Sequence, residues 1–222
     1  MVIVGLIISI LTSVYEVFTQ QRGAVWISYG FVNPLLLLLP RIIYYRWSWI
    51  RESASVVLVK RVELLGTLIL AVSVPGSLFF HDIGVQYDRF IHFSTGILLI
   101  FMASLSASIF YKNHLDNKKH ILKWSGMAVF VGFFLFEFFQ FSTDKIFGTH
   151  LFFDLKQKIT IDVTEDISFA TFGLIFGLLA IYHRFDSIFI KSKNSIFIKN
   201  DSTKVESFFI KQRCLISKIG CL

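Results

Sequence analysis

Six apolar runs, separated by shorter polar stretches, dominate this sequence of 222 residues. A helix that crosses a membrane needs about 20 largely apolar residues, because the hydrocarbon core is about 30 Å thick. Backbone polar groups need partners in that core, so the crossing segments must be helices rather than an open sheet. We therefore predict an all-α, polytopic transmembrane helix bundle of about six spanning helices, with apolar runs at Val2–Phe18, Val25–Leu39, Val62–Phe80, Ile91–Tyr111, Leu122–Phe141 and Ile167–Tyr182.

The composition agrees with a membrane protein. Charged residues make up 17% of the chain, whereas a soluble domain carries about 25%. The fourth and fifth runs reach the spanning length, but the second and sixth are short. The second run continues through Tyr45 only by passing Pro40 and Arg41, and whether the first two runs both cross fully is left open.

Basic residues alternate between the connections. Cytoplasmic loops of membrane proteins carry an excess of Lys and Arg. The connections after the second and fourth runs, and the stretch after the sixth, are rich in these residues, whereas residues 20–23 and 81–90 each carry one. We predict that both termini are cytoplasmic and that the odd connections, including the acidic stretch Ser142–Asp166, face outward. Membrane orientation thus explains the net charge of +7 better than nucleic-acid binding does.

The sequence predicts two parts, a transmembrane domain over residues 1–184 and a basic cytoplasmic tail over residues 185–222. The tail repeats a five-residue pattern, Ser-Ile-Phe-Ile-Lys or Ser-Phe-Phe-Ile-Lys, that begins at Ser187, Ser195 and Ser207. Such a basic, Phe-bearing segment is typical of either a segment lying on an anionic leaflet or a poorly ordered extension. Cys214 and Cys221 lie in this tail without metal-binding spacing, so we expect two free thiols.

Ionisable residues gather at the predicted outer ends of the last three apolar runs. Asp88 and His92 are four residues apart, so they share a helix face. Glu137 lies within an apolar run, where a carboxylate is costly and indicates a functional site. We predict that these pairs lie at one depth and form one cluster, with the members Asp88, His92, Glu137, Gln140, Asp162, Glu165 and Asp166.

Several roles are consistent with such a cluster. Asp88, His92, Glu137 and Asp166 are the candidate catalytic residues and also the candidate ligands of a divalent metal ion, the one cofactor class we consider. Arg89, Gln140, Asp162 and Glu165 are the candidate substrate-binding residues. The alternative is a structural cluster, in which Glu137 pairs with Arg89 or His92 and the acids near Asp166 complement a helix dipole.

At these residues the chain resembles the VanZ-like membrane proteins and the related YjdF-like group of bacterial inner-membrane proteins. The resemblance covers residues 80–180 and implies a polytopic protein of the inner membrane and cell envelope. VanZ-like proteins usually have Asn at the position of Ala170, so their association with glycopeptide resistance does not carry over. The matching pattern is Asp88-Arg89-x-x-His92-Phe93, Glu137-x-x-Gln140 and Asp162-x-x-x-Asp166 followed by Gly173-x-x-x-Gly177.

Three functions follow, in order of preference. The first is an outward-facing envelope protein that binds or acts on lipid or cell-wall-related substrates, and whether it is an enzyme is left open. The second is a scaffold or accessory subunit without catalysis. The third is a proton-coupled transporter, which is disfavoured because we find no matching charges in the inner halves of the helices. Beyond the lipid bilayer, the partners and the oligomeric state are left open.

The predicted topology can be tested with a cysteine introduced at Thr149, after Cys214→Ser and Cys221→Ser replacements. Because residue 149 lies in an outward connection, a membrane-impermeant maleimide should label it in intact cells. Labelling that requires permeabilised cells would reverse the orientation and move the polar cluster to the cytoplasmic side.

Overall fold

The computed structural model describes residues 2–19, 28–75, 87–110, 117–147 and 161–185, together with Ile188. Every regular element within these ranges is a helix, which confirms the predicted all-α class. Residues Met1–His183 form one compact unit. The tail repeats and both cysteines lie outside the described residues, and the domain boundaries stay a prediction.

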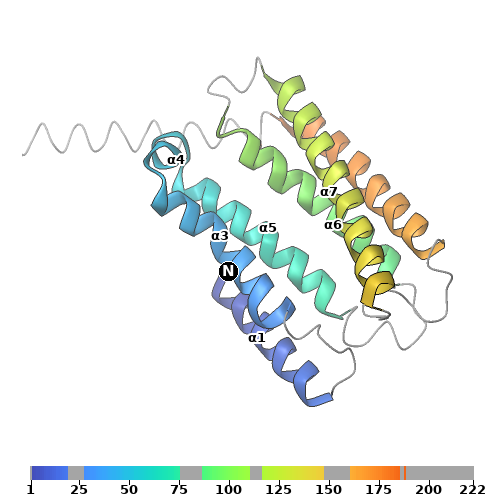
Figure 1. The fold of residues 1–222 in the computed structure, drawn as a ribbon. Coiled ribbons are helices and arrows are strands. Elements are labelled where there is room, and N and C mark those ends of the chain that lie inside the picture. The colour runs from blue at the N-terminus through green and yellow to red at the C-terminus, as the bar shows by residue number, and fades with distance from the viewer. Residues whose placement is uncertain are drawn as a thin grey trace, which may run out of the picture. The chain divides into compact units, whose positions relative to one another are not determined.

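The N-terminal half of the compact unit is built from three packed helices, shown in blue to cyan in Figure 1. They are α1 (Val2–Thr19), α3 (Asn33–Arg46) and α5 (Val56–Pro75), and each contacts the other two. A π-helical turn, η1 (Ser28–Val32), leads directly into α3, and a short helix, α4 (Ser48–Ser53), follows it. Leu37 and Leu70 form a small buried core between α3 and α5.

Two helix boundaries in this half differ from the sequence prediction. The second run does not end at Leu39, because α3 continues through Pro40 to Arg46. Proline is tolerated within membrane helices when neighbouring groups satisfy the freed carbonyl. The third run begins at Val56 rather than Val62, so Lys60 lies in α5 rather than in a loop.

The C-terminal half consists of α6 (Tyr87–Ala107), α7 (Lys118–Phe147) and a last helix, Ile161–Phe185. These three are the described helices that are long and apolar enough to cross a membrane, and Val2–Tyr15 is a shorter apolar helix. α6 packs against α5 and against α7, so it joins the two halves (Figure 1). Six crossings and cytoplasmic termini stay predictions.

The connection between the last two helices is shorter than the sequence indicated. The predicted acidic loop Ser142–Asp166 is helical at both of its ends, because α7 runs to Phe147 and the last helix begins at Ile161. Residues 148–160, which include His150 and Asp154, lie outside the described residues.

The last helix and α6 approach each other so closely that their backbones touch. A Cβ atom on Gly173 would overlap the carbonyl of Phe93, and one on Gly177 would come within 3.3 Å of Ile97 Cα and overlap Ile100. Gly96 on α6 packs against the same stretch of the last helix, since a Cβ at Gly96 would lie 2.9 Å from Leu174 N. Gly173-x-x-x-Gly177 is thus a small-residue motif that lets two helices approach closely, and Gly96 completes the contact from the facing helix.

Replacing Gly173 by Ala should therefore separate α6 from the last helix. Overpacking of this kind costs about 1–3 kcal/mol, so we expect a lower thermal midpoint for the detergent-solubilised protein, measured by tryptophan fluorescence. Gly132→Ala is the matched control, because a Cβ at Gly132 meets nothing within 4 Å. Equal midpoints for the two variants would contradict the close crossing.

Candidate functional site

The centre of the polar cluster is His92, in the second turn of α6. Asp88 lies one turn earlier, in the first turn, where the helix dipole stabilises a carboxylate. The distance from His92 Nε2 to Asp88 Oδ1 is 3.6 Å. This pair comes from one helix face, as the spacing of four residues predicts.

The last helix brings Asp166 to the same imidazole nitrogen. Asp166 Oδ1 lies 3.5 Å from His92 Nε2, and the Asp166 residue is 7% exposed. Asp88, His92 and Asp166 each offer one possible ligand atom, a carboxylate oxygen or an imidazole nitrogen. These three atoms lie within 4.8 Å of one another. The two residues are neighbours because the glycine contact, about two turns further along, holds the helix backbones together.

The spacing of these three ligand atoms is compatible with a bound metal ion. The separations of 3.5 and 3.6 Å are longer than the usual N–H···O distance of about 2.9 Å. Two ligands of a tetrahedral ion, each about 2.1 Å from it, are about 3.4 Å apart. Imidazole and carboxylate together suit zinc and other first-row transition metals.

Glu137 reaches the cluster from α7. Its residue is 2% exposed although the adjacent Phe136 and Phe138 are more than half exposed, so the carboxylate faces inward and the rings face outward. Glu137 Oε1 lies 4.0 Å from His92 Nδ1, on the ring edge opposite to Asp166. Neither carboxylate oxygen has a hydrogen-bond partner within the described part of the chain. A buried polar group in this state is costly and calls for a specific reason.

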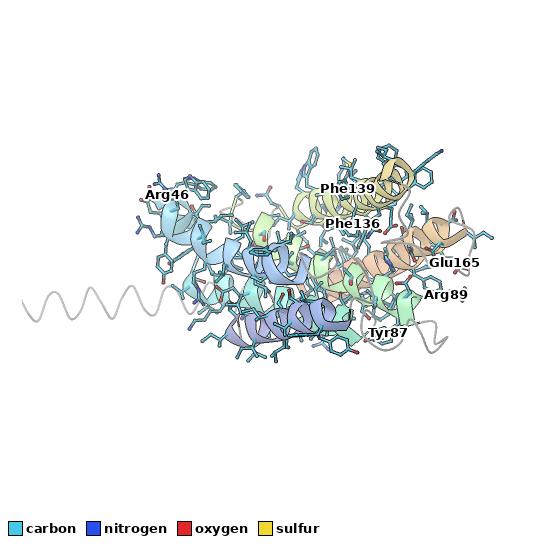
Figure 2. All side chains as sticks on the ribbon, turned by 60° about the horizontal axis from the view of Figure 1, so that its bottom comes forward. Arg46, Tyr87, Arg89, Phe136, Phe139 and Glu165 are labelled. Atoms are coloured by element: carbon cyan, nitrogen blue, oxygen red, sulfur yellow. The ribbon has the colours of Figure 1, made fainter. Side chains whose placement is uncertain are left out.

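Arg89 was one of the two partners expected for Glu137, with His92 as the other, but its ion pair is made elsewhere. Its guanidinium makes a bidentate ion pair with Glu165 on the last helix, through Nη2 at 2.7 and 2.8 Å and Nε at 3.1 Å. The guanidinium also lies over the ring of Phe169. Figure 2 shows Arg89 and Glu165 together at one end of the unit. Both side chains are about one third exposed, at 31% and 32%.

The remaining predicted site residues are less closely tied to His92. Asp162 is 9% exposed and lies one turn before Asp166. Gln140 is half-buried on α7, one turn after Glu137. The structure thus brings together residues from three helices that are far apart in the sequence, and the chemical roles assigned to them stay predictions.

The sequence reasoning missed a second buried charge, Glu63 on α5. Arg41 of α3 donates two hydrogen bonds to its carboxylate, at 2.7 and 2.8 Å, and Glu63 is 3% exposed. The expectation that the inner halves of the helices lack matching charges is therefore wrong. The sequence pattern places Arg41 in the loop after the second run, because Pro40 is expected to end that helix, and Glu63 is not among the predicted site residues.

Within the described residues, long apolar helices joined by a cluster of acids around His92 are those of an all-helical integral membrane protein. The chain belongs to the family described as "Predicted membrane protein (DUF2238)", whose family model matches residues 1–187. No curated protein and no solved structure matches the chain. The family and the apolar helices establish a multi-pass membrane protein in contact with the lipid bilayer.

The Arg41–Glu63 pair predicts an asymmetric response to mutation. The Arg41 side chain is 48% exposed, so it can be solvated when Glu63→Gln removes its partner, whereas Arg41→Ala leaves a buried carboxylate unpaired. We expect Arg41→Ala to lower the free energy of unfolding more than Glu63→Gln does, because only the first variant leaves a buried charge without its partner.

Denaturant unfolding in detergent micelles measures both losses. Lys119→Ala is the control, since Lys119 is an exposed basic residue on α7. A larger loss for Glu63→Gln than for Arg41→Ala would show that the exposed arginine, not the buried acid, is the member that depends on the pair.

Proposed function

We propose that this protein holds a divalent metal ion at Asp88, His92 and Asp166 and uses the site on lipid or cell-wall-related molecules at the outer face of the cell membrane. The observation that carries the proposal is the 2% exposed Glu137 carboxylate, which has no hydrogen-bond partner among the described residues and lies next to His92, one of three ligand-bearing residues whose ligand atoms are within 4.8 Å of one another. Several carboxylates around one imidazole repel each other, and a bound cation offsets that repulsion.

Each residue has a role that follows from its position. Asp88, His92 and Asp166 would bind the ion through one atom each, which leaves room for a further ligand. A metal ion in such a site polarises an oxygen of a bound molecule and activates water. Glu137, beside His92 Nδ1, would orient the imidazole and accept a proton, as carboxylates behind metal-bound histidines do.

The access route favours a ligand that arrives from the membrane surface. The Asp88 side chain is 49% exposed at the start of α6, whereas Glu137 and Asp166 are buried behind it. Arg89, Gln140, Asp162 and Glu165, which lie on the same three helices as the cluster, are proposed to bind the substrate. An arginine in a bidentate pair can exchange one carboxylate oxygen for a phosphate oxygen of a lipid-linked molecule.

The resemblance to VanZ-like and YjdF-like proteins supports a role in the bacterial envelope and an inner-membrane location. The departure at Ala170 has a physical cause here. Ala170 is 1% exposed, and a Cβ atom on Gly96 would overlap its carbonyl. The larger Asn of VanZ-like proteins would not fit this crossing without moving α6.

A structural role is the second candidate, and the Arg89–Glu165 pair is the observation that favours it. That pair joins α6 to the last helix by itself. It does not account for Glu137, because a carboxylate serving only to join helices would be expected to make hydrogen bonds. We therefore rank the scaffold below the metal site and the proton-coupled transporter third.

Metal content decides between these candidates. Tag-free protein, purified without chelator, should contain about one zinc, manganese or iron ion per chain by inductively coupled plasma mass spectrometry. His92→Ala should lose it, and Glu137→Gln should weaken metal affinity about 10–100-fold, as expected for a group that orients a ligand. His120→Ala is the control, because His120 is an exposed histidine on α7.

Two results would contradict the metal site. One is wild-type protein without bound metal whose thermal midpoint does not rise when zinc or manganese is added. The other is equal metal content in His92→Ala and the wild type. If His92→Ala and Glu137→Gln both fail to accumulate as folded protein, the structural cluster is favoured instead.

A further inference from the structure

A long apolar groove runs between the two halves of the compact unit, away from the polar cluster. Its volume is about 720 Å³, and it is lined by side chains from α3, α4, α5 and α6. The lining is almost entirely apolar, with Asn33, Ser73 and Ser106 as its polar side chains. All of the lining residues belong to the described part of the chain, and none of them is a residue of the proposed metal site.

The length of the groove suits an extended hydrocarbon chain. Lining residues on α5 run from Leu58 to Ser73, which is about 22 Å of helix. One leaflet of the hydrocarbon core is about 15 Å deep, so the acyl chain of a lipid in that leaflet fits within this length.

One end of the groove has the residues of a membrane interface. Trp47 and Trp49 line this end, both nearly half exposed, and the Trp49 ring lies 5.5 Å from that of Phe110. Tryptophan is enriched where the hydrocarbon meets the headgroups. The end of the groove at Phe110 is remote from His92. Eighteen residues separate Phe110 from His92, which corresponds to about 27 Å at the rise of a helix.

The same end carries excess positive charge. Arg46 and Arg51 are exposed and each is adjacent in sequence to a residue that lines the groove, and Lys60 lies two residues after Leu58. Glu52 is the acidic residue next to these three basic residues, so the net charge of the group is positive. Figure 2 shows Arg46 at the opposite end of the unit from Arg89 and Glu165. Basic residues beside a membrane surface attract anionic headgroups.

We propose that the groove between α3, α5 and α6 holds one acyl chain of an anionic glycerophospholipid, whose phosphate lies at the basic end formed by Arg46, Arg51 and Lys60. The apolar lining and the length of the groove favour a hydrocarbon chain, and the basic residues at its end favour an anionic headgroup. The lipid fills the space between α5 and α6 and so stabilises the contact between the two halves.

Native mass spectrometry tests this proposal on the full chain. The protein is equilibrated in detergent micelles that contain equal amounts of phosphatidylglycerol and phosphatidylcholine. The wild type should retain one phosphatidylglycerol molecule. Gly66→Leu should reduce this occupancy at least about tenfold, because a Cβ at Gly66 makes an ordinary 3.4 Å contact with Leu37 and the rest of the new side chain occupies the groove.

Gly132→Leu is the matched control, since Gly132 on α7 faces open space. A second pair of variants tests the headgroup. Arg46→Gln/Arg51→Gln should reduce the preference for phosphatidylglycerol over phosphatidylcholine about tenfold. Lys119→Gln/Lys123→Gln removes the same charge from exposed positions on α7 and should leave the preference unchanged.

The proposal is overturned by wild-type protein that retains no phospholipid, by equal lipid occupancy in Gly66→Leu and Gly132→Leu, or by a dimer whose groove face is protected without lipid. A preference for phosphatidylglycerol that survives in Arg46→Gln/Arg51→Gln overturns the assignment of the basic end. If Gly66→Leu does not fold, this charge comparison decides alone, because both arginines are exposed.

Discussion

The backbone contact between α6 and the last helix is the interaction on which the rest of the site depends. In a membrane no hydrophobic driving force brings two helices together, so close packing of small residues supplies the attraction. Gly173 and Gly177 remove the side chains that would hold the helices apart at Phe93 and Ile97. The two helices run in the same direction, and so the acidic start of one lies beside the histidine-bearing start of the other.

The compact unit contains two buried glutamates in contrasting states. Glu63 has a complete partner in Arg41, with two short hydrogen bonds, and its burial is understood as an interhelical link between α3 and α5. Glu137 is equally buried but has no hydrogen-bond partner in the described residues. A protein that can satisfy one buried carboxylate so fully has a reason to leave the other available, and a metal ion or a transferred proton is such a reason.

Much of this architecture was predictable from the sequence, because apolar runs and glycine spacing depend on local pattern. The α6 segment, the pairing of Asp88 with His92 and the role of Gly173 follow from length and helical periodicity. Arg41 and Glu63 were missed because their link depends on two helices whose ends the pattern misplaced, at Pro40 and before Val62. The pairing of Arg89 with Glu165 rather than Glu137 is a choice between acids at one depth, which only three-dimensional packing decides.

The length of α7 links the site to the thickness of the surrounding bilayer. Its 30 residues extend about 45 Å, whereas a hydrocarbon core is about 30 Å thick. The helix must therefore tilt or project beyond the core, and its outward Phe side chains determine how far. Because Glu137 is fixed to this helix, a thicker or thinner membrane changes the depth of the carboxylate below the headgroups. Lipid composition would thus set how readily water and ions reach the cluster, independently of any change in the protein.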